Sequence, residues 1–162
     1  MTRNTTIRYS RRFAVRAALA LGIAIAAVGA SAVPAQAAIQ PKITCSETIS
    51  AIGFSTQTGN VDFNPSGLCL SDGVHRLIFQ TDGNLVLYTN STVDWASNTA
   101  TTTGHIALQT DGNVVIYNSS GRALWASASD RGNYPEYFLV VEGSTASVYG
   151  DATNSPRLWH VS

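Results

Sequence analysis

The sequence predicts an all-β fold in which one small sheet is built three times. A stretch of nine residues that starts at Gln80 returns 29 residues later, at Gln109, almost unchanged. Short strand-like runs are separated by Asp-Gly pairs, the strongest short-range signal for a hairpin. A tryptophan follows each hairpin, and no stretch after Ala38 has a helical period. Repetition at about 30 residues is typical of an array of similar sheet units.

Three hairpins are expected, the third with a looser sequence than the first two. Their strand pairs are predicted at 75–80 and 84–88, at 106–109 and 113–117, and at 137–141 and 146–149. Residues 38–74 would supply the outer strands. Trp95, Trp125 and Trp159 recur once per unit, so we expect them to meet on a shared axis of the core. There each ring can bury about 150–250 Å².

The first 37 residues have the pattern of a secretory signal peptide. A start rich in arginine is followed by an alanine-rich apolar run from Ala17 to Val33 and by a small-x-small cleavage site at Ala35-Gln36-Ala37. A membrane anchor is the alternative, but the run is short and holds alanine rather than leucine or isoleucine. Ser10-Arg11-Arg12 is a partial twin-arginine signal, which leaves the export route open. We therefore expect a secreted chain, with one domain at 38–162 and no membrane insertion after cleavage.

The charge of the chain changes once this segment is removed. The full sequence has a formal net charge of zero, but all ten acidic residues lie after Ala37. Only five lysine and arginine residues remain with them, so the mature chain carries a charge of about −5. Such a surface repels phosphate backbones, which argues against nucleic acid as a partner.

Both cysteines, Cys45 and Cys69, lie in the predicted mature chain. Two thiols in an exported chain most often pair, and this bridge would stabilise the fold by about 3 kcal/mol in the loop-entropy model. Metal binding is the weaker alternative because no histidine lies near either cysteine at metal-ligand spacing. Lipid attachment is weaker too, because no lipobox precedes Cys45. We expect a structural disulfide, and no cofactor or metal.

Each of the first two hairpins repeats five residues at alternate positions. They are Gln80, Asp82, Asn84, Val86 and Tyr88 in the first copy, and Gln109, Asp111, Asn113, Val115 and Tyr117 in the second. Side chains alternate across a strand, so Asn84, Val86 and Tyr88 share one face while Leu85 and Leu87 point into the core. A carboxylate, two amides and a phenol can donate and accept the hydrogen bonds of sugar hydroxyls. The valine methyls can pack on the C–H face of a pyranose ring.

A structural role is the alternative for this pattern. Asp-Gly-Asn is a common turn sequence, and a tyrosine at a strand end often packs at a sheet edge. An internal duplication could also preserve a shape rather than a site. The same five residues in both copies nevertheless favour a ligand site that is made twice.

The two copies match the QxDxNxVxY motif of the bulb-type, mannose-binding monocot lectins, and the Trp-Ala-Ser segments are similar to those of that family. The resemblance covers about residues 45–162. It implies a β-prism II fold, with pseudo-threefold symmetry and three four-stranded antiparallel sheets. It also implies that Asp82 and Asn84 bind the axial 2-hydroxyl of mannose, Gln80 the 3-hydroxyl and Tyr88 the 4-hydroxyl, with Val86 against the ring carbons. Asp111, Asn113, Gln109, Tyr117 and Val115 would take the same roles.

The third unit departs from the motif. Counting back from its tyrosine places Val141, Gly143, Thr145, Ser147 and Tyr149 at the five positions. Only the tyrosine is kept, so we expect that this unit does not bind mannose. The cysteines also precede the first motif, whereas one lies within it in plant relatives. The leader has a bacterial composition, so the plant role in storage or defence is not transferred.

We expect a secreted lectin without catalysis. The chain has no Gly-x-Ser-x-Gly elbow, and its three histidines have no patterned partners. Asp82 and Asp111 belong to different units, too far apart for the paired carboxylates of a glycosidase. A lectin-like bacteriocin and a structural adhesion module with weak or no sugar binding are the alternatives. The family also suggests a homodimer formed by exchange of the C-terminal strand.

Overall fold

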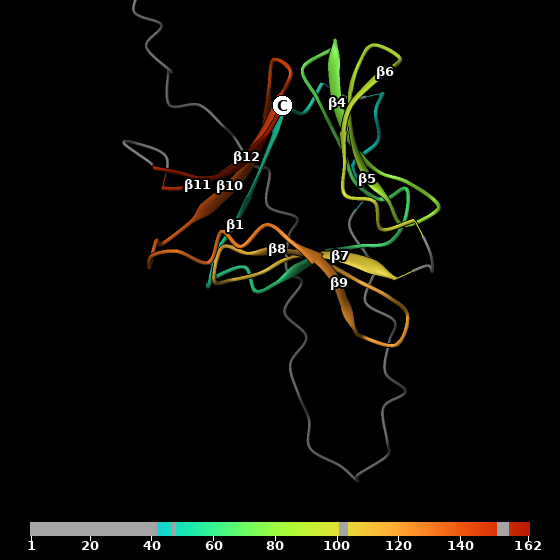
Figure 1. Ribbon diagram of the computed structural model, residues 1–162. Coiled ribbons are helices and arrows are strands. Elements are labelled where there is room, and N and C mark those ends of the chain that lie inside the picture. Colours follow the sequence, from blue (N-terminus) through green and yellow to red (C-terminus); the bar gives the residue numbers. More distant parts are fainter. Residues whose placement is uncertain (1–41, 47, 101–103, 152–155) are drawn as a thin grey trace, which may run out of the picture. The chain divides into compact units, whose positions relative to one another are not determined.

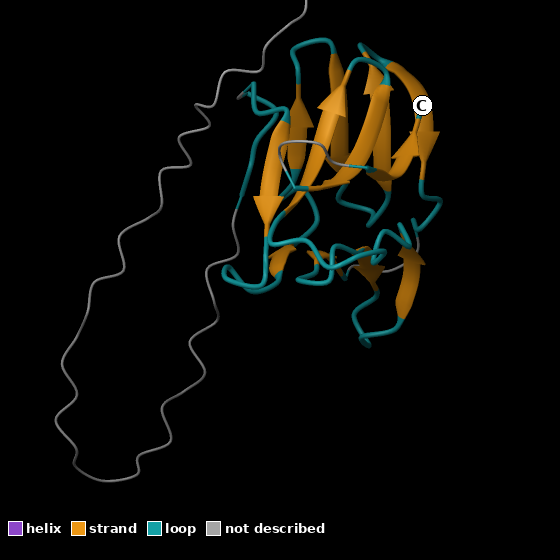
Figure 2. Ribbon diagram, turned by 90° about the vertical axis from the view of Figure 1, so that its left-hand side faces the viewer, coloured by secondary structure: helices purple, strands orange, loops and turns teal. Residues whose placement is uncertain are grey.

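The computed structural model describes residues 42–46, 48–100, 104–151 and 156–162. Every regular element in these ranges is a strand, as Figure 2 shows. Among the described residues, no helix is long and apolar enough to cross a membrane. The leader predicted at 1–37 lies outside these ranges.

Twelve strands are found in the described part of the chain. They are β1 (Ala51–Phe54), β2 (Val61–Phe63), β3 (Cys69–Ser71), β4 (His75–Phe79), β5 (Leu85–Thr89), β6 (Thr92–Ala96), β7 (His105–Leu108), β8 (Val114–Tyr117), β9 (Ala123–Ala126), β10 (Tyr137–Glu142), β11 (Thr145–Gly150) and β12 (Arg157–Val161). The predicted hairpins correspond to β4–β5, β7–β8 and β10–β11.

These strands form three antiparallel sheets of four strands, in the orders β3-β4-β5-β6, β2-β7-β8-β9 and β1-β10-β11-β12. Figure 1 shows the three sheets around a common centre. Each combines three consecutive strands with one outer strand from residues 51–71. The predicted fold class is therefore confirmed, as is the origin of the outer strands.

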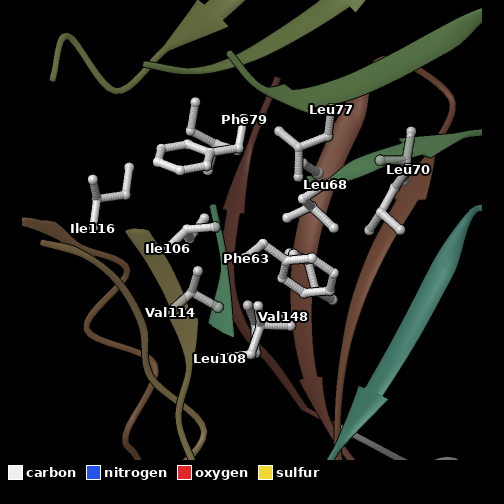
Figure 3. Packing of buried hydrophobic residues seen from close by; sticks show 14 of the residues in the cluster. Phe63, Leu68, Leu70, Leu77, Phe79, Ile106, Leu108, Val114, Ile116 and Val148 are labelled. Atoms are coloured by element: carbon white, nitrogen blue, oxygen red, sulfur yellow. The ribbon is translucent and has the colours of Figure 1, made fainter. Parts of the chain in front are cut away.

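The core lies where the inner faces of the three sheets meet. Its residues come from alternate strand positions, such as Leu77, Leu87 and Ile106, which are all fully buried. Figure 3 shows side chains of all three sheets packed together. Burying one such side chain is worth about 1.5–3 kcal/mol, so the aliphatic alternation read from the sequence is what holds the sheets together.

The three tryptophans form a contacting trio. Trp95 of β6 lies 5.6 Å from Trp125 of β9 and 5.8 Å from Trp159 of β12, and the latter two are 5.5 Å apart, measured between ring centroids. All three pairs meet edge to face, the arrangement that aromatic quadrupoles prefer. The expected shared axis is confirmed, although the rings are partly rather than fully buried.

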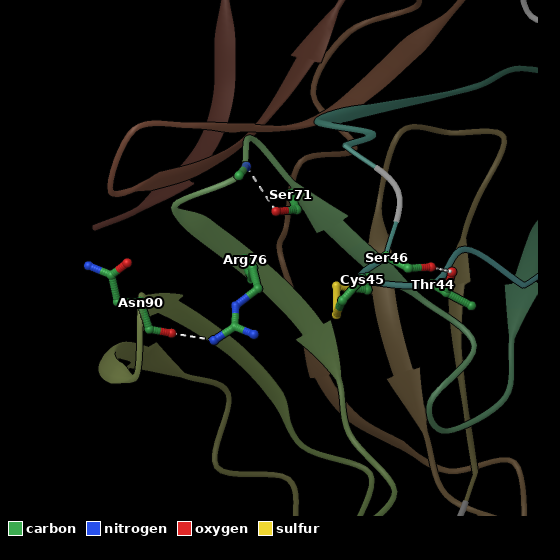
Figure 4. The surroundings of a disulfide bond; sticks show 8 residues. Thr44, Cys45, Ser46, Ser71, Arg76 and Asn90 are labelled. Atoms are coloured by element: carbon green, nitrogen blue, oxygen red, sulfur yellow. Dashed lines mark hydrogen bonds between the residues drawn. A yellow bond between two sulfur atoms is a disulfide. The ribbon is translucent and has the colours of Figure 1, made fainter.

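A disulfide joins Cys45 to Cys69, as predicted, with 5.2 Å between the two Cα atoms. It fastens the segment before β1 to the outer strand β3 (Figure 4). The segment also pairs there through its backbone, because the Cys69 N–H donates to the Ile43 carbonyl oxygen at 2.9 Å. The outer strand of this sheet is thereby covered on its free side.

Candidate functional site

The first two hairpins turn in the same way. The Gln80 N–H donates to the Asn84 carbonyl oxygen at 2.8 Å, and the Gly83 N–H donates to the Gln80 carbonyl oxygen at 3.0 Å. In the second hairpin the Gln109 and Gly112 amides make the same two bonds, both at 2.9 Å. Each turn therefore holds three residues, and its glycine has a left-handed φ that other residues rarely adopt.

The tyrosine and glutamine of each motif are bonded to each other. The Gln80 amide nitrogen donates to the Tyr88 hydroxyl oxygen at 2.7 Å, and Gln109 donates to Tyr117 at 2.9 Å. This bond uses neither the hydroxyl proton of the tyrosine nor the carbonyl oxygen of the glutamine. Both side chains are thus held in place with groups left to bind a ligand.

The aspartate of each motif supports its own turn. Asp82 accepts the Asn84 N–H at one carboxylate oxygen, and Asp111 accepts the Asn113 N–H, both at 2.9 Å. Both aspartates are exposed at the tip of the hairpin. The second carboxylate oxygen has no hydrogen-bond partner among the described residues in either copy. It can accept a hydroxyl proton from a ligand.

The asparagine of each motif is oriented by the serine that directly follows the neighbouring strand, β6 or β9. The Ser97 hydroxyl donates to the Asn84 side-chain oxygen at 2.9 Å and accepts the Leu85 N–H at 3.0 Å. Ser127 does the same for Asn113 and for the Val114 N–H. With its oxygen engaged, each asparagine can turn its NH₂ group toward the outer face.

A second hydroxyl completes each network. Thr99 contacts Ser97 at 2.8 Å and donates to the Gly83 carbonyl oxygen at 2.8 Å, and Ser129 takes this place below the second motif. The sequence reasoning did not assign these serines to the site. The recurrence of serine after Trp-Ala in both segments was the signal that could have found them.

The valines lie on the outer face, as predicted, but they present little surface. Only 2% of Val86 and 4% of Val115 is exposed, and each is paired with a residue of both neighbouring strands. Along its strand, each valine lies between the asparagine and the tyrosine of its motif. The leucines on the opposite face, Leu85 and Leu87, are fully buried in the core as expected.

The third hairpin corrects one sequence assignment. Thr145 pairs with Glu142 across a turn of only two residues, and Val141 pairs with Ala146 and is buried. The assignment of Val141 to the glutamine position is therefore wrong by one residue, because counting back from Tyr149 assumed a turn of equal length. Glu142 occupies that position, and the shorter turn has no aspartate.

The third sheet also lacks the supporting serine. Val161 pairs with Ala146 in the position that Ser97 and Ser127 occupy in the other two sheets. Ser147, at the valine position, is buried. The third unit thus keeps the tyrosine of the motif but neither its amides nor their hydroxyl support.

The chain is similar to several lectins. No protein-family model matches it. A mannose-specific lectin of Aloe arborescens is 43% identical over 75 residues, which is 45% of this chain and 69% of that protein. The crystal structure of a lectin from Allium sativum matches with a TM-score of 0.55 and 38% identity, over 66% of this chain and 99% of that one.

The snowdrop (Galanthus nivalis) agglutinin, solved with methyl α-D-mannoside, matches with a TM-score of 0.51 and 28% identity, over 65% of this chain and 93% of that one. These relatives are lectins, which bind carbohydrate without catalysis, in agreement with the expectation that the chain is not an enzyme. Their coverage and identity, together with the three-sheet fold, place this chain in the family of the bulb-type, monocot mannose-binding lectins.

Proposed function

We propose that this chain is a secreted lectin that binds mannose-containing glycans at two sites, one on each intact hairpin. The observation that carries the proposal is the identical hydrogen-bond scheme of the two hairpins. In both, glutamine is bonded to tyrosine, aspartate to the backbone of the turn, and a serine to asparagine. A duplicated turn would need the bond that aspartate makes, but the bonds to tyrosine and asparagine also orient polar groups on the outer face.

The residue roles follow from the family resemblance and fit this geometry. Asp82 and Asn84 would bind the axial 2-hydroxyl, Gln80 the 3-hydroxyl and Tyr88 the 4-hydroxyl, with Val86 against the ring carbons. The second site would use Asp111, Asn113, Gln109, Tyr117 and Val115 in the same way. Sites of this kind are shallow and individually weak: millimolar affinity corresponds to about 4 kcal/mol. Two sites on one chain would raise the strength of binding to a branched glycan through effective concentration.

Calorimetric or NMR titration with methyl α-mannoside, and with a galactoside for comparison, tests the assignment. We expect two sites in the parent protein, one in Asp82→Ala and in Asp111→Ala, and none in the double variant. Asp94→Ala is the matched control, because Asp94 is an exposed carboxylate of the same sheet outside the motif. Mannose binding that persists in the double variant would refute the site assignment, and no response in the parent protein would favour a non-binding module.

Secretion is the second part of the proposal. It rests on the leader at 1–37 and is supported by the disulfide, since such bonds persist in oxidising compartments. Expression of the full chain in a bacterial host with intact export should give a product outside the cytoplasm that begins at residue 38. Retention of the intact chain in the cytoplasm would contradict it.

A homodimer formed by strand exchange is the third part. In the single chain, β12 pairs with β11 of its own sheet and contributes Trp159 to the tryptophan trio. The same contacts can form between two copies if β12 crosses over. Light scattering after size-exclusion chromatography should find a dimer, and a monomer across micromolar concentrations would contradict this part.

A further inference from the structure

Two sheets carry a hollow at the same place, beside the end of the motif strand that lies away from the hairpin turn. The hollow of the first sheet has a volume of about 460 Å³, and its lining includes Ser71, Val74, Arg76, Asn90 and Ser91. That of the second sheet has a volume of about 410 Å³, and its lining includes Asp62, Asn64, His105, Asn118 and Ser119. Each is lined by the outer strand, the start of the next strand and the turn after the motif, and the first also by Cys45 and Thr48 of the segment before β1.

One side chain connects each hollow to its motif. Arg76 pairs with Tyr88 across β4 and β5, and its guanidinium carbon lies 6.0 Å from the centre of the tyrosine ring. His105 pairs with Tyr117 in the same register and stacks on its ring at 5.1 Å. Directly paired residues share one face of a sheet, so each hollow continues the face that carries the motif.

The two hollows differ in charge. Arg76 is the only charged residue among the described residues that line the first. Its guanidinium donates to the Asn90 carbonyl oxygen (Figure 4), but it has no carboxylate partner in the described part of the chain. The second hollow is lined instead by the Asp62 carboxylate, whose Oδ1 is buried without a hydrogen-bond partner among the described residues.

Asp72, which lies between the lining residues Ser71 and Gly73 in the sequence, is already engaged. It accepts the backbone N–H groups of Val74 and His75, the ring nitrogen of His75 lies 2.8 Å away, and the Gly143 N–H donates to it at 3.2 Å. Among the described residues that line the first hollow, the charge presented to a ligand is therefore that of Arg76.

We propose that the hollow beside the first motif is a subsite for an anionic group of the bound glycan, a phosphate or a carboxylate, and that the second site lacks this preference. The inference rests on the proposed mannose sites. Tyr88 would bind the 4-hydroxyl there, so the hollow lies on the side of the sugar from which the 6-position or the next residue extends. Guanidinium groups match phosphate and carboxylate oxygens with paired hydrogen bonds, whereas the Asp62 carboxylate repels them.

The test compares a mannose oligosaccharide that carries a 6-phosphate with the same oligosaccharide after phosphatase treatment. Each is titrated into Asp111→Ala, which keeps only the first site, and into Asp82→Ala, which keeps only the second. We expect the phosphorylated ligand to bind the first site about fivefold more tightly, as for a favourable exposed ion pair. At the second site the two ligands should bind equally, or the phosphorylated one more weakly. An oligosaccharide ending in mannuronate, titrated in parallel, shows whether the subsite binds a carboxylate as well as a phosphate.

Two further measurements link the preference to Arg76. Adding Arg76→Gln to Asp111→Ala should bring the affinity ratio to about one. Without any change at Arg76, raising the salt concentration to 1 M should lower the ratio, because screening weakens exposed ion pairs. Equal affinities of the two ligands at the first site would overturn this inference and leave the mannose sites standing. If neither ligand binds either single-site variant, the proposed function itself fails.

Discussion

The glycine at the tip of the second hairpin is held between its own turn and the third sheet. Gly112 has a φ of +92°, and a Cβ placed on it would lie 2.2 Å from the Cε1 atom of the Tyr137 ring. That ring cannot yield easily, because it is buried, stacks on Phe54 at 5.7 Å and donates its hydroxyl to the Gly132 carbonyl oxygen. We therefore expect Gly112→Ala to destabilise the fold strongly.

The expected loss in the free energy of unfolding has two parts. An alanine in the left-handed region costs about 1–2 kcal/mol. Overfilling a packed interior adds about 1–3 kcal/mol. Gly112→Ala should thus lower the free energy of unfolding by about 2–5 kcal/mol. Gly121→Ala is the matched control, because Gly121 also has a left-handed φ, +79°, but no atom within 4 Å of an added Cβ. Gly121→Ala should therefore cost only about 1–2 kcal/mol, the part due to the left-handed backbone.

Chemical denaturation followed by tryptophan fluorescence measures both variants. Equal losses of stability would refute the claim that the Tyr137 ring confines this turn. A shift of the turn would also move Asp111, so we expect weaker mannose binding at the second site and unchanged binding at the first. The background Asp82→Ala isolates the second site for this measurement.

Three further predictions concern the disulfide, the lowered pKa of Asp72 and the hydroxyl of Ser127. Replacing Cys45 and Cys69 by serine should lower the free energy of unfolding by about 3 kcal/mol, measured against the parent in urea; an unchanged midpoint would contradict this. Burial raises the pKa of Asp72, but hydrogen bonds from its neighbours outweigh this and lower it to about 2. The ionised carboxylate therefore stabilises the fold above about pH 4, and this contribution is lost toward pH 2. Asp72→Asn should cost roughly 1 kcal/mol at pH 7, after allowance for solvent screening. A difference in stability between parent and variant that persists at pH 2 would exclude the lowered pKa as its cause. Ser127→Ala should cost about 1–3 kcal/mol and weaken mannose binding at the second site, because the Asn113 amide loses its support; NMR titration with full affinity would argue that the serine is only structural.

The parts of the site that could be predicted from the sequence are those set by near neighbours. The Asp-Gly turn, the alternation of aliphatic and polar positions and the motif itself lie within nine consecutive residues in each copy. The third hairpin could not be placed in the same way. Its turn is one residue shorter, and only the pairing of Glu142 with Thr145 reveals this.

Other features of the site depend on residues that are distant in the sequence. Ser97 lies beneath Asn84 because β6 returns beside β5, and the hydroxyl then replaces a hydrogen bond that water would otherwise make. The hollow beside Arg76 forms only when the outer strand and two turns come together. A motif search finds polar residues that repeat, but it does not find the side chains that hold them in position.

The sequence by itself determined the all-β class, the threefold repeat, the two intact motifs and the cysteine pair, because strand alternation and turn chemistry are local properties. Only the tertiary structure decided which outer strand completes which sheet, as when Ala51 pairs with Val140. It also decided that three tryptophans meet and that two equal motifs have neighbouring hollows of different charge. These contacts join residues far apart along the chain, and they are fixed by closure of the three sheets on one core rather than by any short stretch of sequence.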